Sequence, residues 1–509
     1  MFKNHPKGLI PAALANMGER FGFYIMMAIL LLFLNNKFGF TGSEGAIIYS
    51  IFYALIYVLA LVGGIIADKT KKYKSTILVG LILMTLGYVM LAIPTETPVQ
   101  NFPLILAITG LGLFSIAFGN GLFKGNLQAV VGQLYDNPKY ESRREVGFQI
   151  FYMFINIGAM FAPLMAVGLR NWWVMKNGYL FEADLPGLCN RFIDGTITPE
   201  ATERFTELAA SVGGDPSNLT AFANDYLNIF MQGYHYSFGI AIFAMIISLT
   251  IYMVNKAKLP DPAMKSVVID DSAPVEEVKM DPKEVKQRLY ALFAVFAVVI
   301  FFWFSFHQNG QSLTLFADDY TKMLKINLGF TTLEGAEVFQ SFNPIFVVFL
   351  TPVVIAFFGW LKAKGYEIST PKKIMIGMGI AALAFFVMTL GSLGLPTWQE
   401  AQDVGGLTDA QRVTPFLLIG TYLILTIAEL FISPLGIAFV SQVAPPKYQG
   451  VMQGGWLTAT ALGNQLLFIG VIFYKSIPLW ATWTIFVAAC LISMFMMLAM
   501  LKWLEKVAS

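Results

Sequence analysis

Two ionisable residues of opposite charge, Glu19 and Arg20, stand inside a run of about residues 9–34 that is otherwise almost wholly apolar. At 1.5 Å per residue, a helix of that length crosses a bilayer, which places both charges near mid-depth. A charged side chain there costs on the order of 3 kcal/mol, so each should face protein or a water-filled cavity. Because neighbours on a helix point about 100° apart, we expect each charge to find its partner on another helix.

The composition indicates a membrane protein. Of the 509 residues, 56% are hydrophobic and 13% are charged, whereas a soluble domain carries about 25% charged residues. We therefore interpret the chain as a multi-pass protein of the cell membrane, with the lipid bilayer as a partner. The net charge of +2 argues neither for nor against nucleic acid, and we expect no such partner.

The cysteines and histidines do not form a metal or redox motif. Cys189 lies in a polar stretch and Cys490 in an apolar one, while the three histidines, at positions 5, 235 and 307, are widely separated. A disulfide framework, a thiolate metal site and a histidine metal site are therefore not expected. We predict no metal, no cofactor and no catalytic residue.

Twelve apolar runs are long enough to span a bilayer, six on each side of a polar stretch. They cover about 9–36, 46–68, 75–94, 103–134, 145–170, 233–255, 287–316, 337–361, 372–394, 414–443, 449–474 and 478–502. The pattern predicts an all-α membrane protein with two six-helix bundles, residues 1–255 and 287–509. Residues 256–286, rich in Pro, Lys, Asp and Glu, are predicted to join them as a cytoplasmic linker. Residues 171–232 are predicted to form an extracytoplasmic insertion.

Lys and Arg are concentrated in the loops after the second, fourth and eighth runs. These residues are Lys69, Lys71, Lys72, Lys74, Lys139, Arg143, Arg144, Lys362, Lys364, Lys372 and Lys373. Residues 95–102 carry none and 395–413 carry only Arg412. By the positive-inside rule both termini should face the cytoplasm.

In the insertion, the Thr-Pro pair at 198–199 and the Asp-Pro pair at 215–216 are typical of helix starts.

Six segments in both halves resemble the signatures of one family. They are Gly63–Asp68, Phe148–Ala159, Phe302–Asp318, Gln340–Pro344, Glu429–Pro434 and Trp456–Asn464. Because they occur in order over most of the chain, the sequence is similar to the proton-dependent oligopeptide transporter family of the major facilitator superfamily. The resemblance implies the major facilitator fold, in which two bundles rock about a central site.

The resemblance also implies roles for the first-half charges. Glu19 and Arg20 match an acid-x-x-acid-Arg-Phe motif, and Lys124 matches the fourth-helix lysine. Lys124 is the only cation inside its run, so it needs a carboxylate partner, for which Glu19 is the best candidate. Arg20 and Lys124 together then suit a substrate carboxylate. The alternative is a purely structural Glu19–Lys124 ion pair.

In the second half we interpret Glu429 as the only acid inside the core helices. It suits the ammonium end of the same substrate, with Asn156 and Asn343 as neutral hydrogen-bond partners. A zwitterion held by both bundles would pull them together, which is the coupling that alternating access requires.

Four aromatic residues are weaker candidates. By resemblance, Tyr24, Tyr57 and Trp303 line the substrate cavity, and Trp456 lies near a side-chain pocket. Tyr24 is four residues after Arg20 and so shares its helix face. In a chain with 15% aromatic residues, ordinary packing or an interface belt is the competing interpretation.

Three positions depart from the family pattern. Asn16 replaces the first acid of the first-helix motif, Met27 replaces a second arginine, and His307 replaces its seventh-helix acid. These changes bear on proton coupling and not on the fold. Glu19 can still carry the coupled proton. If a substrate carboxylate pairs with Lys124, Glu19 is released from Lys124 and can bind a proton. His307 is a second candidate because histidine titrates near neutral pH, although a structural hydrogen-bonding role competes.

The leading hypothesis is a secondary transporter that imports di- and tripeptides with protons. The alternative keeps the fold but carries another small anion or zwitterion, or moves peptides without tight proton coupling. A membrane enzyme is disfavoured, because the charges are spread one per helix and supply no nucleophile, base and metal cluster. An ion channel is disfavoured too, since no ring or repeated filter sequence is present.

Overall fold

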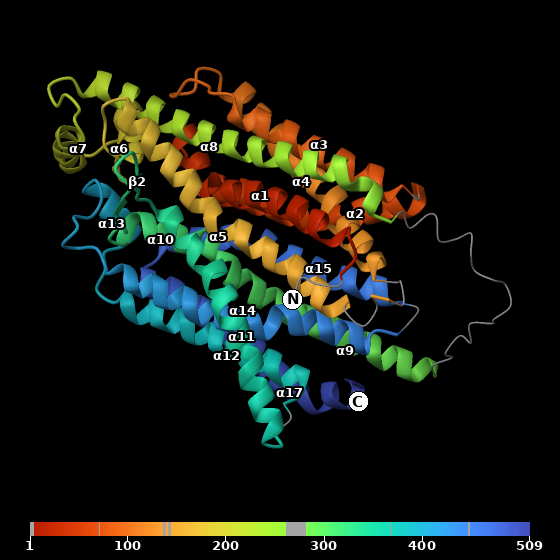
Figure 1. Ribbon diagram of the computed structural model, residues 1–509. Helices are drawn as coiled ribbons and strands as arrows, with labels where there is room; N and C mark the ends of the chain where they lie inside the picture. Colours follow the sequence, from red (N-terminus) through yellow and green to blue (C-terminus); the bar gives the residue numbers. More distant parts are fainter. Residues whose placement is uncertain are drawn as a thin grey trace.

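The computed structural model describes residues 5–70, 72–135, 139–140, 144–260, 281–366, 368–445 and 448–508. Within these residues, twelve helices are long and apolar enough to cross a membrane (Figure 1), which confirms the prediction of twelve spans. Residues 261–280, which make up most of the predicted linker, lie outside the described residues, as does Lys71 of the first basic loop.

The first bundle is built around its N-terminal helix. It consists of α1 (Leu9–Phe38), α2 (Glu44–Thr70), α3 (Tyr73–Ala92), α4 (Phe102–Leu134), α5 (Arg144–Lys176) and α8 (Leu219–Asn255). α1 packs against α5 and α8, and most of its side chains are buried. A helix that is apolar on all sides belongs in a core, and this position encloses the two charges of α1 in protein.

Glycines allow α3 and α4 to pack backbone against backbone. A Cβ added at Gly119 would lie 2.6 Å from the carbonyl oxygen of Gly80, and one added at Gly87 would lie 2.6 Å from that of Gly112. Such small-residue contacts are a usual means of association between helices in lipid, where there is little hydrophobic drive.

The second bundle contains spanning segments that are divided into shorter helices. Its elements are α9 (Pro282–Phe306), η4 (His307–Gly310), α10 (Ser312–Tyr320), η5 (Ala336–Ser341), α11 (Phe342–Ala363), α12 (Thr370–Gly391), α14 (Pro415–Val443), α15 (Gln449–Gln465), α16 (Leu467–Ser476) and α17 (Leu479–Ala508). The seventh run, predicted as one helix, is divided by η4. The carbonyl oxygen of Asn309, freed by this break, accepts hydrogen bonds from Thr314 and Tyr422, as membrane-embedded backbone requires.

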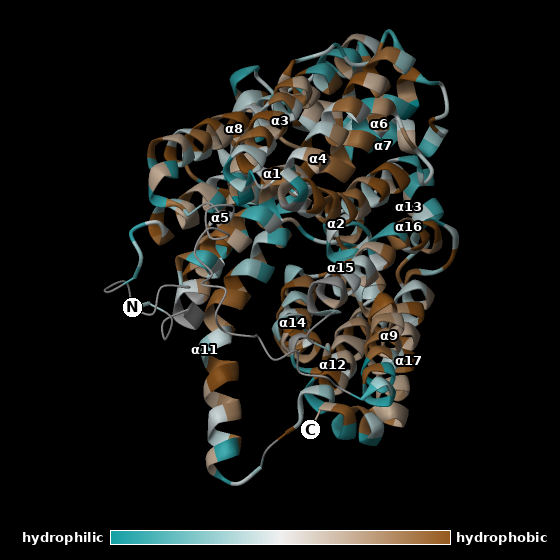
Figure 2. Ribbon diagram, turned by 90° about the vertical axis from the view of Figure 1, so that its right-hand side faces the viewer, coloured by the Kyte–Doolittle hydropathy of each residue, from teal (hydrophilic) through white to brown (hydrophobic). Residues whose placement is uncertain are grey.

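The two bundles meet mainly along α2 with α15 and α5 with α11. Only Pro344 and Val347 of α11 are buried, and Figure 2 shows its far end standing apart from α12 and α14.

Short elements gather at one end of the molecule, which we call the insertion end (Figure 1). They are α6 (Leu185–Ile193), α7 (Pro199–Ser211), α13 (Trp398–Asp403) and the hairpin of β1 (Ile326–Asn327) and β2 (Thr332–Leu333). The helix start predicted at Thr198 is confirmed, because its hydroxyl caps the N–H of Ala201. The extracytoplasmic side of this end stays a prediction.

The sequence placed one helix start wrongly in the insertion. Asp215 does not begin a helix: its carboxylate accepts hydrogen bonds from the backbone and hydroxyl of Ser217 and so forms a turn. α8 begins only at Leu219, capped by Asn218. It therefore starts well before the predicted position near 233.

Ionic and polar contacts close the insertion end between the two halves. The Asp184 carboxylate, just before α6, accepts two hydrogen bonds of 2.7 Å from Nη2 of Arg412, just before α14. Lys475 of α16 donates to the carbonyl oxygens of Thr41 and Gly42. Burial raises the pKa of Asp184 to about 7, against the opposing effect of Arg412.

Replacing Gly119 by Ala should lower the thermal unfolding midpoint of the purified protein by several degrees, because the new methyl group would meet the backbone of α3. Gly110→Ala is the matched control on the same helix, since nothing lies within 4 Å of its Cβ. Ala is the better helix former, so the control should be neutral or slightly stabilising. Equal midpoints for the two variants would contradict the close α3–α4 packing.

Asp184 should make the stability of the protein pH-dependent. Folding raises the pKa of Asp184 above its ordinary value of 3.8. Its contribution to the free energy of unfolding is therefore fully present below pH 3.8 and is lost as the pH rises through about 7. We expect the unfolding midpoint to fall between about pH 4 and pH 7 and to level off above that, and Asp184→Asn to flatten this change. Asp409→Asn, at an exposed position, is the control. A wild-type midpoint that climbs over this interval would contradict the assignment.

Candidate substrate site

The two charges of α1 neutralise each other directly, which corrects the prediction that each needs a partner on another helix. Nε of Arg20 lies 2.5 Å from Oε2 of Glu19, and Nη2 lies 2.6 Å from Oε1. Both side chains are almost fully buried. The long arginine side chain folds back along the helix, so the angle between neighbouring Cβ atoms does not limit the reach of its guanidinium group.

A residue that the sequence analysis missed completes this pair. Nδ2 of Asn120, on α4, donates a 2.7 Å hydrogen bond to Oε1 of Glu19. The available signal was its spacing: Asn120 is four residues before Lys124 and shares its helix face. The guanidinium carbon of Arg20 also lies 4.5 Å from the centre of the Phe23 ring.

Lys124 lies near this cluster but does not join it. Its Nζ is 5.1 Å from the centre of the Tyr57 ring, a cation–π contact. Lys124 interacts electrostatically with both Glu19 and Arg20. Among the described residues, however, no carboxylate lies within ion-pair distance of it. The predicted Glu19–Lys124 contact is therefore wrong for this conformation, because Arg20 already occupies Glu19.

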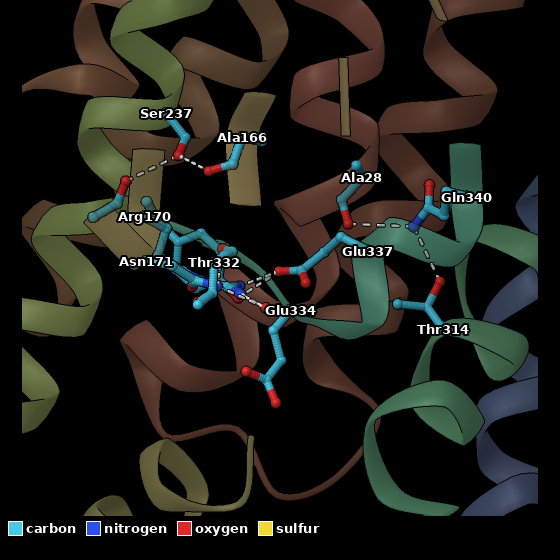
Figure 3. Close-up of polar contacts among 12 residues, drawn as sticks. Ala28, Ala166, Arg170, Asn171, Ser237, Thr314, Thr332, Glu334, Glu337 and Gln340 are labelled. Carbon is cyan, nitrogen blue, oxygen red and sulfur yellow. Dashed lines mark hydrogen bonds and ion pairs between the residues drawn. The ribbon is translucent and has the colours of Figure 1, made fainter. Parts of the chain in front are cut away.

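In the second bundle, Glu429 is held by neutral partners. Nδ2 of Asn343, on α11, donates to Oε2 of Glu429, on α14, at 2.8 Å and lies 3.1 Å from the hydroxyl oxygen of Thr426. Glu429 is thus oriented by a neutral amide. Among the described residues, no cation forms an ion pair with it. The interpretation of Glu429 as the only core acid of this half is wrong, since Glu337 of η5, which pairs with Arg170 of α5 (Figure 3), is fully buried too.

A cavity of about 120 Å³ lies between the two bundles. Four of the predicted substrate residues line it: Tyr24, Asn156, Asn343 and Glu429. The sequence analysis missed several further polar residues that line it, namely Tyr49, Tyr53, Tyr152, Asn309 and Gln340. The amide of Asn156 donates to the carbonyl oxygen of Tyr152 on its own helix. The structure therefore brings together an acid and several neutral hydrogen-bonding groups from both halves.

The other predicted residues lie around this cavity without lining it. His307 stacks on Trp303 at 4.9 Å and contacts Tyr53 at 5.0 Å between ring centres, and Trp456 meets Trp303 at 6.5 Å. Nδ1 of His307 is 2.5 Å from the amide oxygen of Asn464.

Tyr53 links the cavity to the cations of the first bundle. It lines the cavity and contacts Tyr57 at 5.9 Å between ring centres. Tyr57 in turn carries Lys124 over its ring. Lys124 therefore lies behind a tyrosine layer, and Arg20 interacts electrostatically with Tyr24 and Tyr57, as Glu429 does. The described residues include no cluster of three or more His, Cys, Asp or Glu placed to hold a metal.

Twelve spanning helices in two bundles around a central polar cavity define a major facilitator transporter fold. A sequence model described as the POT family matches residues 74–273 and 263–479 of the chain. The protein therefore belongs to the POT family of transporters and not to a family of enzymes.

Known proteins of this kind are similar over nearly the whole chain. The peptide transporter YePEPT of Yersinia enterocolitica is 29% identical over 486 residues, covering 91% of this chain and 87% of its own. Dipeptide and tripeptide permease B of Xenorhabdus bovienii is 25% identical, covering 91% and 86%. A solved POT family transporter in complex with 5-aminolevulinic acid superimposes with a TM-score of 0.71 at 21% identity, covering 100% and 98%.

Asn120→Ala should destabilise the protein, because the buried Glu19 carboxylate would lose one hydrogen bond. We expect a loss of about 1.5–3 kcal/mol of unfolding free energy, the range for hydrogen bonds to charged groups. In a Glu19→Gln background the same substitution should cost much less. Asn224→Ala is the control, since its amide donates only within its own helix. Additive effects of Asn120→Ala and Glu19→Gln would contradict the contact.

Proposed function

We propose that the protein imports di- and tripeptides together with protons by alternating access. The observation that carries this is the cavity between the bundles, with the acid Glu429 on its second-half side and the cations Arg20 and Lys124 behind its first-half side. Family membership supports it, as do the printed names of relatives that transport peptides. The protein acts in the cell membrane with both termini in the cytoplasm.

Glu429 binds the ammonium end of the peptide. It lines the cavity, its carboxylate is oriented by Asn343, and Asn156 lines the same cavity from the other bundle. An ammonium group donates three hydrogen bonds, which suits one carboxylate and two amide oxygens. Binding there joins α14 and α11 to α5.

Arg20 and Lys124 bind the carboxylate end. A guanidinium group offers a planar fork and an ammonium group a point charge, and together they suit a carboxylate. Tyr24 lines the cavity and lies on the same helix face as Arg20. Tyr57, Trp303 and Trp456 form the aromatic surroundings of this site.

Glu19 couples the peptide to a proton. In the present conformation Arg20 neutralises Glu19. A peptide carboxylate that engages Arg20 competes with Glu19, which keeps only the Asn120 amide and then takes up a proton. His307 is the second coupling candidate, although its hydrogen bond to Asn464 and its stacking on Trp303 also suit a structural role.

A second candidate function rests on the same departures that the sequence showed. Met27 lines the cavity at the position where the family carries an arginine. His307, which stacks on Trp303, stands at the position where the family carries an acid. A protein of this fold could then carry another small anion or zwitterion, or move peptides without tight proton coupling.

Proteoliposomes with an alkaline interior should accumulate labelled dialanine, and a protonophore should abolish the accumulation. N-acetyl-dialanine, which lacks the ammonium group, should enter poorly. Glu429→Gln should raise the dialanine concentration for half-maximal uptake about tenfold or more and remove the discrimination between the two peptides. Lys124→Ala should abolish accumulation, whereas Lys286→Ala and Glu203→Gln, both at exposed positions, should not.

Counterflow separates the two candidates, because exchange of peptide needs no proton gradient. If dialanine undergoes counterflow but does not accumulate with a proton gradient, the proposed peptide site is supported and proton symport is refuted. Failure of dialanine counterflow, with exchange of another small anion, would replace the peptide by that cargo.

A further inference from the structure

A groove of about 500 Å³ opens in the second bundle, at the end of α11 that lies far from the insertion end. The last turns of α11, the start of α12 and the ends of α14 and α17 form its walls. Figure 2 shows the end of α11 standing apart from α12 and α14 at this place. The described residues that line the groove include none of the predicted substrate residues, so it is separate from the central cavity.

Two lysines from different helices line this groove. Lys362 lies in the last turn of α11, and Lys373 lies in the first turn of α12. Nζ of Lys373 is 4.4 Å from the centre of the Phe358 ring on α11, which places this ammonium group between the two helices. The one acid among the described lining residues is Glu505 of α17, whose carboxylate accepts a hydrogen bond from the hydroxyl of Ser369. The lining therefore carries a net positive charge.

More lysines stand on the elements that form the groove. Lys364 follows α11 and lies 4.2 Å from the centre of the Trp360 ring. Lys372 lies on α12, and Lys502 and Lys506 lie in the last part of α17, all with exposed side chains. Basic pockets between spanning helices attract the headgroups of anionic lipids. The positive-inside rule accounts for the charge of such loops, but it does not account for a groove beside them.

The wall of the groove on α11 is apolar and open. A Cβ added at Gly359 would meet nothing within 4 Å, so this part of the groove can accept further atoms. Phe358 packs on Phe431 of α14 at 5.0 Å between ring centres and forms the inner wall. Phe349 and Trp360, on the same helix, are 68% and 52% exposed. A spanning helix with such side chains faces the hydrocarbon of the bilayer, so the groove opens toward lipid.

We propose that this groove binds one anionic phospholipid, with its phosphate at Lys362 and Lys373 and one acyl chain against Phe358 and Gly359. A soluble anion would use the lysines but not the apolar wall, and a lipid without net charge would use the wall but not the lysines. The bound lipid fills the space between α11 and α12. It thereby supports the helix that carries Asn343, the residue that orients Glu429. The proposal does not rest on peptide transport.

Native mass spectrometry of the full-length protein in detergent tests the site. The protein is titrated with phosphatidylglycerol, with phosphatidylcholine of the same acyl chains and with glycerol 3-phosphate. We expect one saturable phosphatidylglycerol site, binding of phosphatidylcholine at least about tenfold weaker, and no binding of glycerol 3-phosphate at the same concentrations. Lys362→Gln with Lys373→Gln should weaken phosphatidylglycerol binding more than about tenfold. Lys283→Gln with Lys286→Gln, which removes two exposed lysines from the start of α9, should leave it unchanged.

A second variant tests the apolar wall without changing the charge. Gly359→Leu should fill the groove and weaken phosphatidylglycerol binding, whereas Gly110→Leu on α4, where the Cβ is equally open, should not. Because the two tests are independent, loss of the fold in one variant leaves the other decisive.

Four results would overturn the proposal. They are equal affinities for the two lipids, glycerol 3-phosphate binding as tightly as the lipid, an equal loss of affinity in the α9 control, and unchanged lipid binding by folded Gly359→Leu. The first would show that charge has no part, the second a site for free anions, and the third a general attraction to surface lysines. The fourth would place the acyl chain outside the groove.

Discussion

A charge inside the spanning region is costly unless protein groups stabilise it, and the arrangement of the protein follows from this constraint. The carboxylate of Glu19 is satisfied by Arg20 on the same helix and by Asn120 on α4, while Lys124 rests on the ring of Tyr57. These partners come from one bundle, in which Glu19 and Arg20 neutralise each other while Lys124 has no carboxylate within ion-pair distance among the described residues. In the second half, the amide of Asn343 donates to Glu429, and no cation among the described residues forms an ion pair with this carboxylate.

The same constraint acts at two depths with opposite consequences. At the cavity, the charges of the two halves are not paired with each other, so a zwitterion can join them. At the insertion end, Arg170 and Glu337 are paired across the halves and buried, so the closed arrangement is stabilised without a substrate. In this conformation the contacts close the insertion end, whereas the charges at the cavity do not pair across the two halves, which is the arrangement that the proposed peptide binding needs.

Hydropathy alone predicted the twelve spans, because length and apolar content decide whether a helix crosses a membrane. It failed at the start of α8, where Asp225 and Asn228 looked like loop residues but bind Tyr179 and the backbone of Thr97. The sequence identified four of the residues that line the cavity, but it missed others such as Tyr49, Tyr53 and Tyr152 and could not give the pairing of the charges. The Glu19–Arg20 contact depends on a side-chain conformation, and Glu337 stands at the edge of an apolar run where sequence does not distinguish core from surface.

In the proposed mechanism one peptide spans the two halves, with its ammonium at Glu429 and its carboxylate at Arg20 and Lys124. The most direct measurement is a structure determined with bound dialanine. We predict density in the central cavity with the ammonium within hydrogen-bond distance of Glu429, and with Arg20 turned from Glu19 toward the peptide carboxylate. A bound peptide that contacts only one bundle, or a Glu19–Arg20 pair left intact beside it, would contradict this account.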